Sequence, residues 1–227
     1  MIRTGTKFRV KCTVPDSVAT VLTAMKPVFV HVSKNGGTSV VESAGNQIVN
    51  AGHRTASSWL AEHGDVALLF AVVRHPYERV ASEYAYRRHR LLGGEQNPHL
   101  NDAAESVSDW VVATLAGGRY RTSEFFERTG EPFNTSNMVD GSLIWFVPQT
   151  RWLGDDDGHL LVDEIMRFER IDADWARFCE RHGIDAPLRH RNASPGSVAA
   201  RDGLDNRVKK IIHDHYRSDF EAFGFAP

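Results

Sequence analysis

Cysteine is scarce in this chain, with only Cys12 and Cys179 among 227 residues. Two cysteines are too few for a disulfide framework, and their spacing is not that of a metal site. The eleven histidines form neither an HExxH box nor a histidine-rich tract, so we predict a protein that binds no metal. Cys179 falls within a predicted helix, where we expect it to be a small residue of the core.

A long apolar run and a strong excess of one charge are also missing. No stretch of about 18 apolar residues occurs, and the N-terminal sequence MIRTGTKFRVKC lacks the apolar segment of a secretory signal. We therefore expect a cytoplasmic protein with no membrane span. The net charge of −2 and the pI near 6.6 argue against a nucleic acid as partner.

Internal repeats, heptads and low-complexity linkers are absent as well, and we predict a single domain over residues 1–227. With 41% hydrophobic residues, a chain of this length buries one sizeable core without dividing. Residues 1–26 are the least informative part. We interpret them as an N-terminal extension that adds an edge strand around 7–12.

The most informative segment is VFVHVSKNGGTSVVESAG at 28–45, where an apolar strand leads directly into a glycine loop. Glycines let backbone N–H groups approach an anion closely, and the following helix start directs its unpaired donors at the same point. Several charge-assisted hydrogen bonds, each contributing about 1.5 to 3 kcal/mol, hold a nucleotide phosphate. The candidate residues are Lys34, Gly36, Gly37, Thr38 and Ser39. A plain turn with a serine or threonine cap is the alternative.

The position of the lysine separates this loop from the ordinary ATP-binding pattern. That pattern has a glycine, four residues, a second glycine, and then a lysine followed by serine or threonine. Here Lys34 precedes both glycines. The order therefore argues against a standard ATPase or GTPase.

A second segment, ALLFAVVRHPYERVASEYAYRRHR at 67–90, contains an apolar run that ends in Arg74. Pro76 marks a helix start, and Ser82 follows about two turns from Arg74, so both can face the space above the strand ends. An arginine at the carboxyl end of a parallel strand lies where open α/β sheets bind ligands. The alternative is a surface arginine that pairs with a carboxylate, beside a helix that only packs.

Together, HVSKNGGTS at 31–39 and VVRHPYERVASEY at 72–84 resemble the two nucleotide motifs of sulfotransferases that use 3′-phosphoadenosine-5′-phosphosulfate (PAPS). The heparan-sulfate-type branch and its small bacterial relatives look most similar. The resemblance implies that Arg74 and Ser82 hold the 3′-phosphate. It also implies a 5′-phosphosulfate site made of Lys34, Asn35, Gly36, Gly37, Thr38 and Ser39. Ser33 and Asn35 replace the family's usual proline and threonine, and neither change removes a charge.

Further segments that resemble the family lie at 146–153, 165–184, 190–196 and 208–225. The resemblance therefore covers nearly the whole chain from about residue 27. An ordered series of motifs arises by chance much less often than a single glycine loop. Asn192 and Ser194 belong to HRNASPG, a loop that lies near the nucleotide in relatives, and this implies that they contact the donor. An ordinary turn before Pro195 is the alternative.

The resemblance also implies the chemistry. A sulfuryl group would pass from PAPS to a hydroxyl or amine of a small-molecule or glycan acceptor, with adenosine 3′,5′-bisphosphate (PAP) as product and no metal. Such an in-line displacement depends on positioning and on neutralising charge on the leaving phosphate. The compact ammonium of Lys34 suits the second task.

A hydroxyl acceptor must also lose a proton, and histidine, with an unperturbed pKa of about 6.5, is suited to take it. His53 is our candidate, because it lies between the two nucleotide motifs, where glycan-type relatives place a catalytic histidine. The alternatives are Glu42 or His31 as the base, and a simple loop histidine at position 53. His31 alternates with apolar residues and is interpreted as a core histidine.

Three other functions fit parts of the pattern. A small-molecule kinase would need the Gly-Lys-Thr order and a magnesium site. A non-catalytic nucleotide-binding module would not need Lys34, Arg74, Ser82 and a well-placed histidine together. A Golgi-type membrane enzyme would need an anchor segment, which this sequence lacks.

Apolar periodicity predicts an α/β fold with a central, mainly parallel sheet flanked by helices. The resemblance implies that this fold is of the P-loop type. Asp172 is expected to cap a helix that ends at Gly183. Irregular segments at 92–102 and 133–141 are the candidates for acceptor recognition. Strands are expected at 28–32, 67–73 and within 164–170, and further helices at 38–50, 56–62, 76–91, 103–116, 119–129 and 208–225.

Overall fold

The computed structural model describes residues 26–94, 106–117, 138–139, 142–143, 146–191 and 194–227. A four-stranded sheet runs through it in the order β2 (Val49–Asn50), β1 (Val28–Val30), β3 (Leu69–Val73), β6 (Glu164–Arg167). All three neighbouring pairs are parallel. This sheet confirms the predicted α/β fold.

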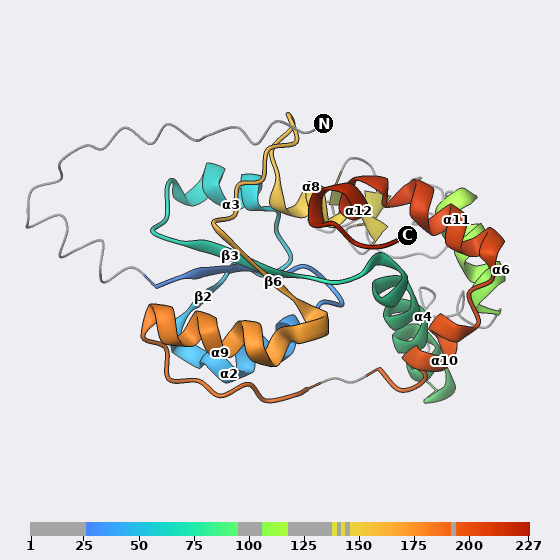
Figure 1. The fold of residues 1–227 in the computed structure, drawn as a ribbon, viewed down its shortest axis with the longest axis horizontal. Helices are drawn as coiled ribbons and strands as arrows, with labels where there is room; N and C mark the ends of the chain where they lie inside the picture. Colours follow the sequence, from blue (N-terminus) through green and yellow to red (C-terminus); the bar gives the residue numbers. More distant parts are fainter. Residues whose placement is uncertain (1–25, 95–105, 118–137, 140–141, 144–145, 192–193) are drawn as a thin grey trace, which may run out of the picture.

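Alternating side chains of β1 and β3 enter two cores, one on each face of the sheet. Phe29, Phe70 and Val72 belong to one core, whereas the residues between them belong to the other. Figure 1 shows two helices over each face: α2 (Gly37–Ala44) and α9 (Ile171–His182) on one, α3 (Ala56–His63) and α8 (Gln149–Leu153) on the other. Burial of both faces explains why these strands are continuous apolar runs.

Helix α2 is shorter than the helix predicted at 38–50. It ends at Ala44 because Gly45 adopts a φ of 54°, which favours glycine. A 3-10 turn, η1 (Gly45–Gln47), and strand β2 follow. The prediction for 45–50 was therefore wrong, since the chain returns to the sheet as an edge strand beside β1.

N-terminal caps set the starts of the next two helices. Thr55 Oγ1 accepts a backbone N–H of the first turn of α3 at 3.1 Å. Helix α4 (Pro76–Leu92) begins with a proline, and His75 Nδ1 accepts the Tyr77 N–H at 3.3 Å. Because Nδ1 is an acceptor, the ring proton is on Nε2, which donates to the Ala226 carbonyl at 2.9 Å. His75 therefore ties the C-terminal segment to the start of α4.

The remaining elements are the antiparallel pair β4 (Met138–Val139) and β5 (Ser142–Leu143), the helices α6 (Val107–Val111), α10 (Ser197–Asp202), α11 (Asn206–His215) and α12 (Arg217–Phe223), the π-helical turn η3 (Val112–Ala116) and the 3-10 turn η6 (Phe168–Arg170). Strand β4 lies within 133–141, which was predicted to be irregular. The helix predicted at 119–129 and the edge strand predicted at 7–12 lie outside the described residues.

Two predictions about helix ends were wrong. Asp172 lies in the first turn of α9, where it is not the cap, and Asp174 instead accepts the Arg167 backbone N–H at 2.8 Å. The predicted C-terminal helix is divided at Tyr216, whose φ of −105° and ψ of 24° separate α11 from α12. Four apolar residues of this predicted helix, Val208, Ile212, Phe220 and Phe223, are buried in the core.

A buried network centred on Gln149 ties the sheet to the C-terminal helices. Gln149 Oε1 accepts from Asn35 Nδ2 at 2.7 Å and from the Arg74 backbone N–H at 2.8 Å. Its Nε2 donates to the Arg74 carbonyl at 2.9 Å and to Asp219 at 3.1 Å. Burial raises the pKa of Asp219, while Arg79 and the hydrogen bonds that this carboxylate accepts act against the rise. The loops after β1 and β3 are therefore held by one amide.

Replacement of Gln149 by leucine should lower the free energy of unfolding by about 3 to 5 kcal/mol, because buried polar groups of Asn35, Arg74 and Asp219 lose their partners. Gln47→Leu is the matched control, since Gln47 bonds to the Asp185 backbone near the surface. Gln47→Leu should lower the free energy of unfolding by less than about 1 kcal/mol. Chemical denaturation followed by circular dichroism measures both, and equal losses would contradict the role of Gln149.

Candidate functional site

The carboxyl ends of β1 and β3 open onto a cavity of about 440 Å³, called the donor cavity below after the donor that the sequence resemblance implies. Neighbouring parallel strands end at the same edge of a sheet, so the loops that follow them meet there. Most of the residues singled out in the sequence line this cavity: Lys34, Gly36, Gly37, Thr38, Ser39, His53, Arg74 and Ser194.

The glycines of the first loop leave no room for a side chain. A Cβ at Gly37 would lie 2.1 Å from a ring carbon of His31, and one at Gly36 would lie 2.9 Å from the Phe168 ring. Gly36 also has a φ of 78° and is the N-cap of α2, where no side chain accepts a hydrogen bond from the first turn. The first N–H groups of α2 are therefore available to an anion in the cavity.

Lys34 is held between the loop and α4. Its backbone has a φ of 65°, the one positive value among the described residues other than glycine. Its ammonium lies 4.0 Å from the centre of the Tyr86 ring and 3.4 Å from Ser194 Oγ. Burial lowers the pKa of Lys34, the Glu83 carboxylate opposes this, and nearby arginines add to the lowering.

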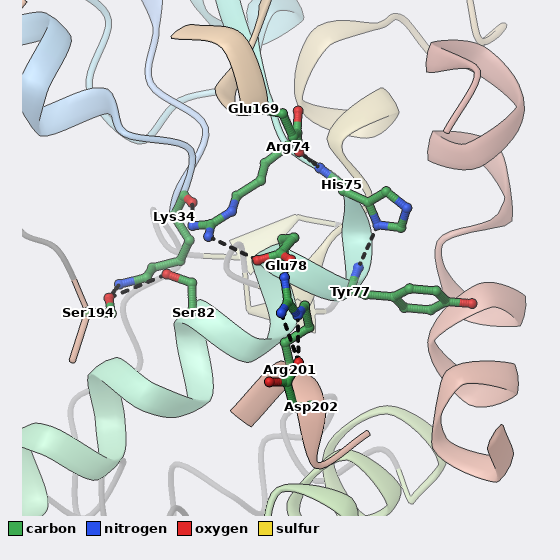
Figure 2. A network of polar contacts seen from close by, with 10 residues as sticks. All are labelled: Lys34, Arg74, His75, Tyr77, Glu78, Ser82, Glu169, Ser194, Arg201 and Asp202. Carbon is green, nitrogen blue, oxygen red and sulfur yellow. Dashed lines mark hydrogen bonds and ion pairs between the residues drawn. The ribbon is translucent and has the colours of Figure 1, made fainter. Parts of the chain in front are cut away.

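Arg74 reaches into the cavity from the end of β3 (Figure 2). Its Nη1 donates to the Lys34 carbonyl at 3.1 Å, and its Nη2 lies 3.5 Å from Glu78. The guanidinium lies 4.1 Å from the centre of the Phe168 ring. Burial lowers the pKa of Arg74, while Glu78 and Glu169 act in the opposite direction. The second loop thus places a cation next to the first loop.

Ser82 and Ser194 meet although they are far apart in the sequence. Their hydroxyl oxygens are 3.3 Å apart, and Ser82 is buried on α4. Figure 2 shows Ser194 beside both Lys34 and Ser82. The structure thereby brings together the sequence-predicted residues of the β1 loop, of α4 and of the segment that precedes α10.

Three predicted residues do not line the donor cavity. Ser82 is buried beside it, against the lining residue Ser194. The Asn35 side chain is buried beneath the loop, where Nδ2 donates to the Val72 carbonyl at 2.7 Å and to Gln149. It supports the loop from inside, and only its backbone N–H is left as a candidate donor to an anion. Asn192 lies outside the described residues.

The candidate base His53 is exposed at the rim of the cavity and is oriented by His31. His53 Nδ1 lies 3.2 Å from the His31 carbonyl oxygen, and the two ring centres are 4.8 Å apart. His31 lines the cavity and is only partly buried, so its interpretation as a core histidine was wrong. Burial, together with repulsion from His53, lowers the pKa of His31 to about 4. Glu42 is not part of the cavity lining and pairs with Arg191 at 3.0 Å.

A comparison with known families identifies the protein family behind this arrangement. The model of the sulfotransferase family matches residues 10–226. The chain belongs to the sulfotransferase family. No curated protein and no solved structure matches it significantly. Within the described ranges, no helix of this sulfotransferase combines the length and the apolar character that a membrane crossing requires.

Side chains of α2 and η1 attach the segment 185–191 to the element that follows the sulfotransferase's glycine loop. Ser39 Oγ accepts the Arg191 N–H at 2.9 Å, and Ser43 Oγ accepts the Arg189 N–H at 2.8 Å. Gln47 exchanges two hydrogen bonds with the Asp185 backbone. The spacing of four residues between Ser39, Ser43 and Gln47 is visible in the sequence. The segment whose backbone they bind is not, because it lies far along the chain. Ser39 therefore shapes the cavity wall as well as lining it.

Residues that the sequence reading missed also line the sulfotransferase's cavity. Tyr86 contacts Lys34, and Phe168 packs against both Gly36 and Arg74. Neither aromatic residue lies within the two nucleotide motifs at 31–39 and 72–84. Tyr86 follows Ser82 by one helical turn on α4, which was the one signal that it shares the face of α4 toward the cavity.

One group of possible metal ligands lies apart from the donor cavity. Asp155, Asp157 and His159 have ligand atoms within 4.8 Å of one another. Asp155 already accepts the His159 backbone N–H at 2.8 Å and pairs with the His159 ring at 3.4 Å. These contacts close the turn between α8 and β6, where Gly154 and Leu160 form an isolated bridge.

The low pKa of His31 makes stability depend on pH. Between pH 6.5 and about 4, the unfolded chain binds a proton at His31 that the folded protein does not, so the free energy of unfolding should fall as the pH falls. The gap between the two pKa values corresponds to about 3 kcal/mol. His31→Gln should remove this component. Chemical denaturation of both proteins across this range tests it, and identical pH dependences would refute it.

Proposed function

We propose that the protein transfers a sulfuryl group from PAPS to a hydroxyl or amine of a small-molecule or glycan acceptor. The observation that supports this most strongly is the convergence of Lys34, Arg74 and the glycine loop on one cavity, with Ser82 in contact with the lining residue Ser194. A lysine-first loop and an arginine from the next strand supply two anion sites within one cavity, which suits a nucleotide with phosphates at both the 5′ and 3′ positions.

The residues of the cavity fit such a donor. The 5′-phosphosulfate would lie at the start of α2, where the first N–H groups have no side-chain cap. The 3′-phosphate would lie at Arg74 and Ser82. A guanidinium has five N–H donors, and the contacts of Arg74 with Lys34 and Glu78 leave others for a phosphate. Its buried Nε has no hydrogen-bond partner among the described residues.

PAPS supplies the activated sulfuryl group, whose bond to the 5′-phosphate breaks as the acceptor oxygen bonds to sulfur. Lys34 neutralises the negative charge that develops on the leaving phosphate oxygen. Tyr86 and Ser194 hold its ammonium at the mouth of the glycine loop. This interaction strengthens as the charge develops, and therefore stabilises the transition state more than the bound substrate.

His53 takes the proton of the acceptor hydroxyl. When Nδ1 carries the ring hydrogen, it donates to the His31 carbonyl at 3.2 Å. This tautomer leaves the lone pair of Nε2 as the acceptor of a proton. The low pKa of His31 keeps that neighbour neutral at pH 7, so it adds no second positive charge beside a protonated His53. An amine acceptor would be oriented by the same nitrogen.

The cavity suits a kinase less well. A kinase holds magnesium between the phosphates with a hydroxyl and an acidic residue. Among the described residues that line the cavity, Glu83 is the single carboxylate, and it pairs with Arg87 at 2.7 Å. A non-catalytic nucleotide-binding module is also less well supported, because an oriented histidine and the lysine line the same cavity.

Calorimetric titration with PAP tests the donor assignment. The wild type should bind PAP more tightly than ATP with magnesium. Arg74→Ala should weaken PAP binding on the order of 10- to 100-fold, because charge-assisted hydrogen bonds to the 3′-phosphate are lost. Arg74→Lys retains the positive charge but not the planar, forked arrangement of donors. Its affinity for PAP should lie between those of the wild type and Arg74→Ala. Unchanged affinity in both variants, or a preference for ATP with magnesium, would refute the assignment.

His53→Ala should leave PAP binding unchanged and lower the turnover of a hydroxyl acceptor on the order of 100- to 10,000-fold, because the positioned base is lost. Transfer of radiolabelled sulfate from PAPS to a panel of sugars and phenols provides the assay. His63→Ala is the matched control, since His63 lies exposed on α3 outside the cavity lining and should retain full activity. Full activity of His53→Ala would point to another base.

A further inference from the structure

Glu78 stands between two arginines at the edge of the donor cavity (Figure 2). Its Oε2 lies 3.5 Å from Arg74 Nη2, and its Oε1 accepts a hydrogen bond from Arg201 Nη1 at 2.9 Å. Glu78 belongs to the first turn of α4, whereas Arg201 comes from α10, which packs against α4. One carboxylate therefore connects the donor cavity with an element far along the chain.

Arg201 is itself held in a defined position. Its Nε and Nη2 donate to Asp202 Oδ1 at 3.0 and 2.8 Å, which leaves Nη1 for Glu78. Glu78 and Arg201 both line a second cavity of about 470 Å³, together with Glu169 and Lys209. Neither is part of the donor cavity lining. The pair of Glu78 and Arg201 thus forms behind Arg74, outside the space for the donor.

The carboxylate of Glu78 competes with a phosphate for Arg74, because both anions accept hydrogen bonds from the same guanidinium. The distances show how Glu78 divides between its partners. The contact with Arg201 at 2.9 Å is a full hydrogen bond, whereas that with Arg74 at 3.5 Å is a loose ion pair. The carboxylate of Glu78 is therefore bonded more closely to Arg201 than to Arg74.

We propose that Arg201 is a positioning residue for donor binding, which restrains Glu78 and so keeps the Arg74 guanidinium available to a phosphate. The inference rests on the proposed function, because the phosphate concerned is the 3′-phosphate of PAPS or PAP. Arg201 acts through Glu78. Loss of the Arg201 side chain should therefore weaken donor binding only while residue 78 carries a negative charge.

Calorimetric titration with PAP at low salt tests this in the wild type, Arg201→Gln, Glu78→Gln and the double variant. Arg201→Gln should weaken binding about two- to fivefold, as for the loss of a partly exposed charge pair. The same substitution in the Glu78→Gln background should have no measurable effect. High salt should reduce the loss of affinity that Arg201→Gln causes, because it screens charges at the surface. Arg217→Gln removes an exposed arginine that pairs with Asp214 outside both cavities, and should bind as the wild type does.

The possible outcomes separate the inference from the proposed function. Equal affinity of the wild type and Arg201→Gln, or the same loss in both Glu78 backgrounds, would overturn the role of Arg201 and leave the donor assignment intact. A wild type that does not bind PAP would overturn the proposed function and this role with it. Circular dichroism and thermal midpoints like those of the wild type establish that each variant is folded.

Discussion

The side-chain amide of Gln149 holds the two loops of the donor cavity in one fixed relation. It bonds to Asn35 below the glycine loop and to both backbone polar groups of Arg74, and Asp219 orients it from α12. The sheet alone sets where β1 and β3 end, but not how the following turns face each other. A fully buried amide with two donors and two acceptor sites fixes that relation.

The cations of the cavity have partners before any ligand arrives. Lys34 contacts the Tyr86 ring, Arg74 contacts the Lys34 carbonyl, and Arg191 pairs with Glu42. Such preorganisation reduces the reorganisation that binding requires, because the side chains are already ordered. These partners are weaker acceptors than a phosphate with several negative charges, so a nucleotide donor can replace or extend them.

Local patterns in the sequence were sufficient for β1, β3 and β6, the glycine loop, and the positions of Lys34, Arg74 and Ser82. Each depends on alternation, on a turn or on a helix start within a few residues. Gln149 and Asp219 escaped prediction because their partners are distant in the chain, and a buried amide looks like any surface glutamine in a sequence. The early end of α2 depended on the conformation of Gly45, which sequence periodicity does not encode.

Lys34 adopts a left-handed backbone conformation that suits glycine better. An L-residue with a side chain is less stable there by about 1 kcal/mol or more. Glycine at this position would relax the turn but would also remove the ammonium group from the cavity. Random mutagenesis selected for heat resistance alone would therefore favour glycine at this position. In the proposed mechanism, which requires the ammonium group, thermostability and turnover would oppose each other at this single residue.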